Sequence, residues 1–153
     1  MFRCKACGAI NRVPASKRES GAQAVCGRCK NPLDLSGEPQ DVDAAAFERT
    51  VSSAPIPILV DFWAPWCQPC RMASPIMDQV ARQRAGSLIA LKVNTEEQPA
   101  PANAYGIRAI PSFIVFKDGR EAARQSGVLP RPQFEQWLDS VLQGASADAT
   151  SHP

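Results

Sequence analysis

The sequence contains six cysteines, and every one belongs to a Cys-x-x-Cys pair. The pairs are Cys4/Cys7, Cys26/Cys29 and Cys67/Cys70. In a reducing compartment, cysteines paired at this spacing are typical of metal binding or redox catalysis rather than of structural disulfides. The single histidine, His152, is the residue before last, so neither a Cys–His dyad nor a Cys/His metal site is expected. The cysteines therefore carry the candidate chemistry.

Cys67 and Cys70 lie between an apolar run at residues 58–64 and an amphipathic run that follows them. At helical spacing the second run places four apolar residues: Met72, Ile76, Met77 and Val80. The pattern predicts a strand, a tight turn and a helix, with both cysteines at the helix start. A helix N-terminus offers free N–H groups and partial positive charge, which lower the pKa of a thiol placed there. We predict that Cys67 is an attacking thiolate and Cys70 its resolving partner in dithiol–disulfide exchange.

The other two pairs lie in residues 1–33, at the spacing of four-cysteine zinc ribbons. The segment has few large apolar residues, so metal binding would supply the folding free energy that its core lacks. Gly8 and Gly27 each follow a cysteine and suit the left-handed backbone of metal-binding turns. Two disulfides are the alternative interpretation, which a reducing compartment disfavours. We predict one structural Zn²⁺, without an open catalytic position, held by Cys4, Cys7, Cys26 and Cys29.

Asp61 and Lys92 each interrupt an apolar strand pattern. Carboxylates are seldom buried without a partner, and burial raises their pKa toward values that suit proton exchange with a thiol. The alternative is that Asp61 lies at a solvated strand end. If the two strands are neighbours, Lys92 can interact with Asp61; alternatively its side chain extends to the solvent.

The remaining patterns divide the chain into four parts. A zinc-binding module occupies residues 1–33, a polar linker 34–42, an α/β domain 43–143 and a disordered tail 144–153. The elements predicted in the α/β domain are a helix at 44–52, a strand at 58–64, a helix from about 69 to 84, a strand at 88–93, a short helix at 100–105, strands at 112–116 and 120–126, and a final amphipathic helix around 134–141. The strand–helix–strand unit predicts a parallel, right-handed crossover.

The charge is uneven, because residues 1–33 hold seven Lys and Arg residues against one Glu. Such asymmetry can mark a nucleic-acid-binding surface. Phe2 is, however, the only aromatic residue of that segment, so the stacking platforms of single-strand binders are missing. No secretory signal and no apolar run of about 18 residues is present. We therefore expect a soluble cytoplasmic protein with neither a nucleic-acid nor a membrane partner.

Several of these motifs together resemble the thioredoxin family, from about Asp41 to Leu142. The matching segments are Val60–Ala64, Trp66–Cys70, Lys92–Asn94, Tyr105–Arg108, Ile110–Pro111, Phe116–Gly119 and Gly127. With the four-cysteine extension, the chain is similar to the zinc-binding thioredoxin 2 class of bacteria. The resemblance implies a thioredoxin fold, in which helices flank a central mixed sheet, preceded by a zinc-ribbon-like module.

The resemblance also implies roles for individual residues. Asp61 and Lys92 match the family's buried aspartate and its lysine partner, which act with the two cysteines. Pro111 matches the family's cis-proline. The substrate-binding surface would include Trp66, Gln68, Pro69, Ile110, Pro111 and Gly127.

By the same resemblance, the protein would be a monomeric protein-disulfide reductase without an organic cofactor. Its partners would be disulfide-containing client proteins and an NADPH-dependent thioredoxin reductase. Gln68 and Ser112 depart from the family's usual glycine and threonine, and residues between the cysteines influence the reduction potential. A disulfide oxidase or isomerase and a zinc-based redox sensor or chaperone remain alternative hypotheses.

Overall fold

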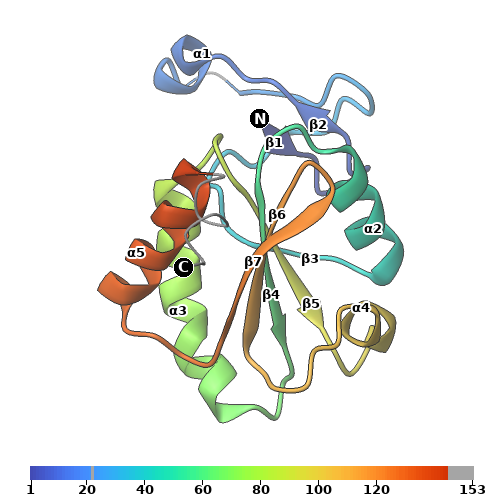
Figure 1. Cartoon of the computed structure of the whole chain (residues 1–153). Helices are drawn as coiled ribbons and strands as arrows, with labels where there is room; N and C mark the ends of the chain where they lie inside the picture. The colour runs from blue at the N-terminus through green and yellow to red at the C-terminus, as the bar shows by residue number, and fades with distance from the viewer. Residues whose placement is uncertain (22, 145–153) are drawn as a thin grey trace.

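A five-stranded mixed sheet forms the centre of the molecule in the computed structural model, which describes residues 1–21 and 23–144. The strand order is β3-β5-β4-β6-β7 (Figure 1). The bounds are Gln40–Asp41 for β3, Ile58–Trp63 for β4, Ile89–Asn94 for β5, Ser112–Lys117 for β6 and Arg120–Ser126 for β7. This architecture confirms the predicted mixed sheet.

The strand β4 lies in the middle of the sheet and is followed by the helix α3, Gln68–Gln83. The helix leads to β5, which pairs with β4 in parallel, with Asp61 opposite Lys92 in the register. The strand β6 pairs with β4 antiparallel. Five of the six residues of β4 are buried, because helices cover both faces of the sheet at this point. The crossover therefore places the start of α3 directly beyond the end of β4.

Two layers of helices cover the sheet (Figure 1). The helices α2, Ala44–Ser53, and α4, Pro99–Ala104, pack on one face. The helices α3 and α5, Arg131–Gln143, pack on the other. Asp43 caps α2, since its side chain accepts a hydrogen bond from Ala46 N–H at 2.8 Å. On the α2 face the ring of Phe47 makes edge-to-face contacts with Phe62 and Phe116.

The N-terminal module, residues 1–33, contains a two-stranded antiparallel sheet and one short helix. These elements are β1, Phe2–Arg3; β2, Ile10–Asn11; and α1, Ala15–Glu19. The module lies at the end of the central sheet opposite to the start of α3 (Figure 1).

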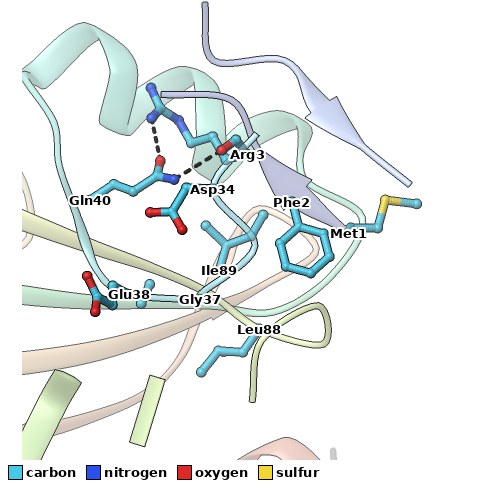
Figure 2. Close-up of a pocket in the computed structure, with 10 residues that line it drawn as sticks. Met1, Phe2, Arg3, Asp34, Gly37, Glu38, Gln40, Leu88 and Ile89 are labelled. Carbon is cyan, nitrogen blue, oxygen red and sulfur yellow. Dashed lines mark hydrogen bonds between the residues drawn. The ribbon is translucent and has the colours of Figure 1, made fainter. Parts of the chain in front are cut away.

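Arg3 joins the module to the rest of the protein (Figure 2). Its Nε donates to Thr50 Oγ1 at 3.2 Å, and its guanidinium also donates to Gln40 Oε1 at 2.8 Å. The amide of Gln40 returns a hydrogen bond to Arg3 O at 3.0 Å. Burial lowers the pKa of the Arg3 guanidinium. Phe2 is buried beside this contact, so the module has a packed interface with the α/β domain.

The segment 34–42, which the sequence presents as a linker, includes part of the central sheet. Gln40 and Asp41 form β3 and pair in parallel with Leu91 and Lys92 of β5. Two polar residues show no apolar alternation, so nothing in their pattern indicates a strand. The predicted disordered tail falls, apart from Gly144, outside the described residues, as does His152. Within the described ranges, no helix combines the length and apolar character that spanning a bilayer requires.

Candidate active site and metal site

The first turn of α3 carries both cysteines of the candidate redox pair. Cys67 is the residue that precedes the helix, and its Sγ accepts a hydrogen bond from Cys70 N–H at 3.2 Å. Cys67 and Cys70 form a disulfide, with their Cα atoms 5.3 Å apart. Gln68 and Pro69 open the helix, where a proline removes no intrahelical hydrogen bond. The unpaired N–H groups of this helix end stabilise negative charge on Cys67 Sγ once the disulfide is reduced.

A second loop approaches Cys67 from the start of β6. The Ile110–Pro111 peptide bond is cis, as the resemblance implies. Ile110 O lies 3.7 Å from Cys67 Sγ. Gly127, at the end of β7, donates its N–H to Pro111 O at 2.8 Å and has a φ of +86°, which favours glycine. The structure thus brings Ile110, Pro111 and Gly127 together beside the dithiol.

The surface around the disulfide is exposed, whereas the sulfur atoms are not. Cys67 and Cys70 are each 4% exposed, while the neighbouring Trp66 is 65% exposed. Gln68 and Pro69 are also exposed. The prediction that Met72 lies on the apolar side of α3 with Ile76, Met77 and Val80 is wrong, because its side chain is 59% exposed.

Asp61 lies under this surface and is only 1% exposed, so the solvated strand end is the wrong alternative. Its Oδ1 has no hydrogen-bond partner among the described residues. Burial raises the pKa of Asp61 from 3.8 to about 7, against the opposing effect of the Lys92 charge. Lys92 is half-buried and makes no ion pair within 4.0 Å among the described residues; its Nζ lies 4.9 Å from the centre of the Trp63 ring.

Asp61 and Cys70 line the same cavity, which has a volume of about 100 Å³. The complete lining is Asp61, Trp63, Cys70, Arg71, Ser74 and Lys92. A cavity of this size with several polar groups has room for water, so a proton can pass between the carboxyl group and the thiol of Cys70. The site therefore combines a disulfide at a helix start with a buried acid that titrates near neutral pH.

The other four cysteines meet in the N-terminal module. Their sulfur atoms all lie within 4.8 Å of one another, and the pairs Cys4/Cys29 and Cys7/Cys26 are each 3.6 Å apart. A tetrahedral Zn²⁺ with bonds of about 2.3 Å to each thiolate would place the sulfur atoms about 3.8 Å apart. The four cysteines are thus positioned to bind one metal ion, and their donor set fits zinc.

Hydrogen bonds to the sulfur atoms support the same interpretation. Backbone N–H of Arg28 donates to Cys26 Sγ at 3.3 Å, and Asn31 Nδ2 donates to Cys29 Sγ at 3.2 Å. Hydrogen bonds from backbone N–H groups and from the Asn11 side chain lower the pKa of the Cys26 thiol. Hydrogen bonds from a backbone N–H group and from the Asn31 side chain lower the pKa of the Cys29 thiol. Both effects favour the thiolates that metals bind.

The two cysteine turns share one hydrogen-bond pattern. Cys4 O accepts from Gly8 N–H at 2.8 Å, and Cys26 O accepts from Lys30 N–H at 2.9 Å. Gly8 has the expected left-handed backbone, with φ +82°, but Gly27 does not. Its role falls to Lys30, with φ +67°, because the left-handed residue is the one after the second cysteine of each pair.

The thioredoxin family model matches residues 38–140. "Thioredoxin C-3" from Corynebacterium nephridii is 39% identical over 140 residues, which cover 92% of this chain and 94% of that protein. This match is longer than residues 34–153, so it extends into the N-terminal module. A "Thioredoxin" from Synechocystis sp. is 41% identical over 108 residues, 71% of this chain and 100% of that protein. A mutant thioredoxin from Halobacterium salinarum NRC-1 has a similar structure, with a TM-score of 0.63 and 27% identity over 71% of this chain and 95% of that one.

Proposed function

This chain belongs to the thioredoxin family of thiol–disulfide oxidoreductases, and we propose from this premise that Cys67 and Cys70 reduce disulfides of client proteins. The observation that carries the proposal is the Cys67–Cys70 disulfide at the start of α3, in contact with the cis Ile110–Pro111 loop. The exposed side chains of Trp66, Gln68 and Pro69, together with Ile110, Pro111 and Gly127, form the surface that receives the client.

The proposed reaction begins with both cysteines reduced. The Cys67 thiolate attacks one sulfur of a client disulfide; the client S–S bond breaks, a mixed disulfide forms and one client thiolate leaves. Cys70 then transfers its proton to the Asp61 carboxylate and attacks Cys67 Sγ. The second client thiolate leaves, so two electrons have moved to the client and Cys67–Cys70 is oxidised. The charge of Lys92 favours the ionised form of Asp61 and so opposes the effect of burial on the pKa of this carboxyl group.

The proposal extends to partners and location. Within the cytoplasm, an NADPH-dependent thioredoxin reductase would return two electrons to the Cys67–Cys70 disulfide of a monomeric protein. One Zn²⁺ bound by the four cysteines of the N-terminal module would have a structural role, because four thiolates leave no open coordination position.

Insulin reduction with dithiothreitol as the electron source tests the assignment. We expect Cys67→Ser to lose the activity, because the attacking sulfur is gone. Cys70→Ser keeps that sulfur and is the matched variant: once reduced, freed of dithiothreitol and mixed with insulin, it should form the mixed disulfide and accumulate it, which a mass measurement of the protein detects. Full insulin reduction by Cys67→Ser would contradict the proposed roles.

The reduction potential distinguishes a reductase from an oxidase or isomerase, because Gln68 replaces the usual glycine. We expect equilibration with dithiothreitol to give a potential near the value of about −270 mV known for thioredoxin. A value between about −180 and −120 mV would instead indicate a disulfide oxidase or isomerase.

A further inference from the structure

The strand register brings a carboxylate, an indole and an ammonium to one face of the sheet. Asp61 and Trp63 are two residues apart on β4, so their side chains point to the same face. Lys92 stands directly opposite Asp61 on β5. Register alone would therefore favour a direct ion pair between Asp61 and Lys92.

The side chains adopt a different arrangement. Lys92 Nζ lies over the Trp63 ring, 4.9 Å from its centre, within the range of cation–π attraction. Among the described residues, no ion pair within 4.0 Å joins Lys92 to Asp61, and Asp61 Oδ1 has no hydrogen-bond partner. The Lys92 ammonium group thus contacts the Trp63 ring instead of forming an ion pair with the Asp61 carboxylate.

We propose that Trp63 is a positioning residue that holds the Lys92 ammonium on its ring face and so keeps Asp61 free to exchange a proton with Cys70. A direct ion pair would stabilise the carboxylate and weaken it as a base toward the Cys70 thiol. The proposal rests on the proposed function for its catalytic consequence, while the arrangement itself is independent of any client.

Other charges near Asp61 do not account for the arrangement. The charged groups around it are Lys92 on the neighbouring strand β5, Asp41 on β3 beyond that strand, and Arg71 and Asp78 on α3, which also carries Cys70. Its neighbour on β6 is the uncharged Phe113. Asp41 and Asp78 both raise the pKa of Asp61 by repulsion. Arg71 lines the cavity but donates to Pro65 O at 2.8 Å. Of these charges, only the Lys92 ammonium contacts Trp63, so Trp63 acts on Asp61 through the position of Lys92.

The test is a carbon-13 NMR titration of the Asp61 carboxyl group in the oxidised protein, where neither cysteine titrates and no client is needed. We expect Trp63→Leu, which removes the ring face, to lower the pKa of Asp61 by about one pH unit or more. The reason is that the released Lys92 ammonium can then approach the carboxylate and stabilise its charged form. Trp63→Phe keeps a weaker cation-binding ring and should lower it by less. Since Trp63 is only half-buried, both variants should fold.

The Lys92→Met background separates release of the ammonium from entry of water, which would also lower the pKa of Asp61. In that background, Trp63→Leu should no longer lower the pKa. An unchanged pKa in the single Trp63→Leu variant, or an equal fall with Lys92→Met, would overturn the proposal.

A kinetic measurement links the arrangement to catalysis. The pH at which resolution of a preformed mixed disulfide reaches half its maximal rate should fall in Trp63→Leu by the same amount as the pKa of Asp61. A fall in the pKa without this shift would overturn the catalytic consequence. Failure of the reductase proposal would appear separately, as insulin reduction by Cys67→Ser.

Discussion

Asp61 is a residue whose burial opposes folding. The folded chain raises the pKa of this carboxyl group from 3.8 to about 7, because burial disfavours the charged form more than Lys92 favours it. Between these two values the folded state holds a proton that the unfolded state releases, so the free energy of unfolding falls as the pH rises. Above about pH 7 both states are ionised and the loss is complete.

Asp61→Asn should therefore stabilise the oxidised protein at high pH, because asparagine resembles the protonated acid. The shift in pKa corresponds to a gain of up to about 4 kcal/mol above pH 7, falling to nothing near pH 4. Urea unfolding of both proteins from pH 4 to pH 9 measures the difference. A gain of equal size at every pH would contradict the titration as its cause.

At the scale of single residues, the residues that can carry out chemistry were easier to predict from the sequence than the contacts between side chains. Cysteine spacing indicates both the dithiol and the metal site, and a charge within an apolar run draws attention to Asp61. The contact between Lys92 and Trp63 depends on strand register and on which neighbour the lysine side chain approaches, and the sequence specifies neither. Lys30 has a left-handed backbone that its residue type does not suggest.

At the scale of elements, the segment 34–42 is held against the end of α3. Gly37 has a φ of +81°, and a Cβ atom there would lie 2.6 Å from Ala85 Cβ and 2.9 Å from Ala81 O. Backbone atoms cannot move aside as a flexible side chain can. The close approach fixes the path of the chain from the N-terminal module to β3.

Gly37→Ala should lower the free energy of unfolding for two reasons, the left-handed backbone and the collision with α3. Gly21→Ala is the matched control, because Gly21 also has a positive φ, +75°, but no atom of the described part of the chain lies within 4 Å of its Cβ position. The backbone cost is about 1–2 kcal/mol in each. Urea unfolding should therefore show a larger loss for Gly37→Ala; equal losses would mean that the segment moves away from α3 freely.

Most of the elements that sequence patterns predicted contain enough apolar residues to show a period, although α4 and β7 do not. The strand β4 has a long apolar run. In the structure, Asp118 and Gly119 connect β6 to β7 with the positive φ that short hairpin turns require. By contrast, β1, β2 and β3 contain two residues each. Their pairing follows from the metal-site turns and from the docking of 34–42, which are tertiary effects.

At the scale of the whole molecule, the N-terminal module and the start of α3, where Cys67 precedes the helix, lie at opposite ends of the central sheet (Figure 1). The N-terminal module is connected to the α/β domain by buried Phe2 and by the hydrogen bonds of Arg3 with Thr50 and Gln40. Order in the module and stability of the domain should therefore be coupled, although the module is remote from Cys67.

Removal by a chelator of the metal ion that we propose for this module should thus destabilise the α/β domain without abolishing its activity. We expect a loss of about 2–4 kcal/mol, from exposure of Phe2 and from the broken hydrogen bonds of Arg3, seen as a lower urea midpoint for Trp fluorescence. Insulin reduction in the absence of urea should remain, because the dithiol is far from the module.

Arg3→Met is the control: it weakens the connection, so the metal should stabilise the domain less. An identical midpoint with and without metal would show that the two parts fold independently, and loss of insulin reduction in a still-folded metal-free protein would contradict a purely structural metal.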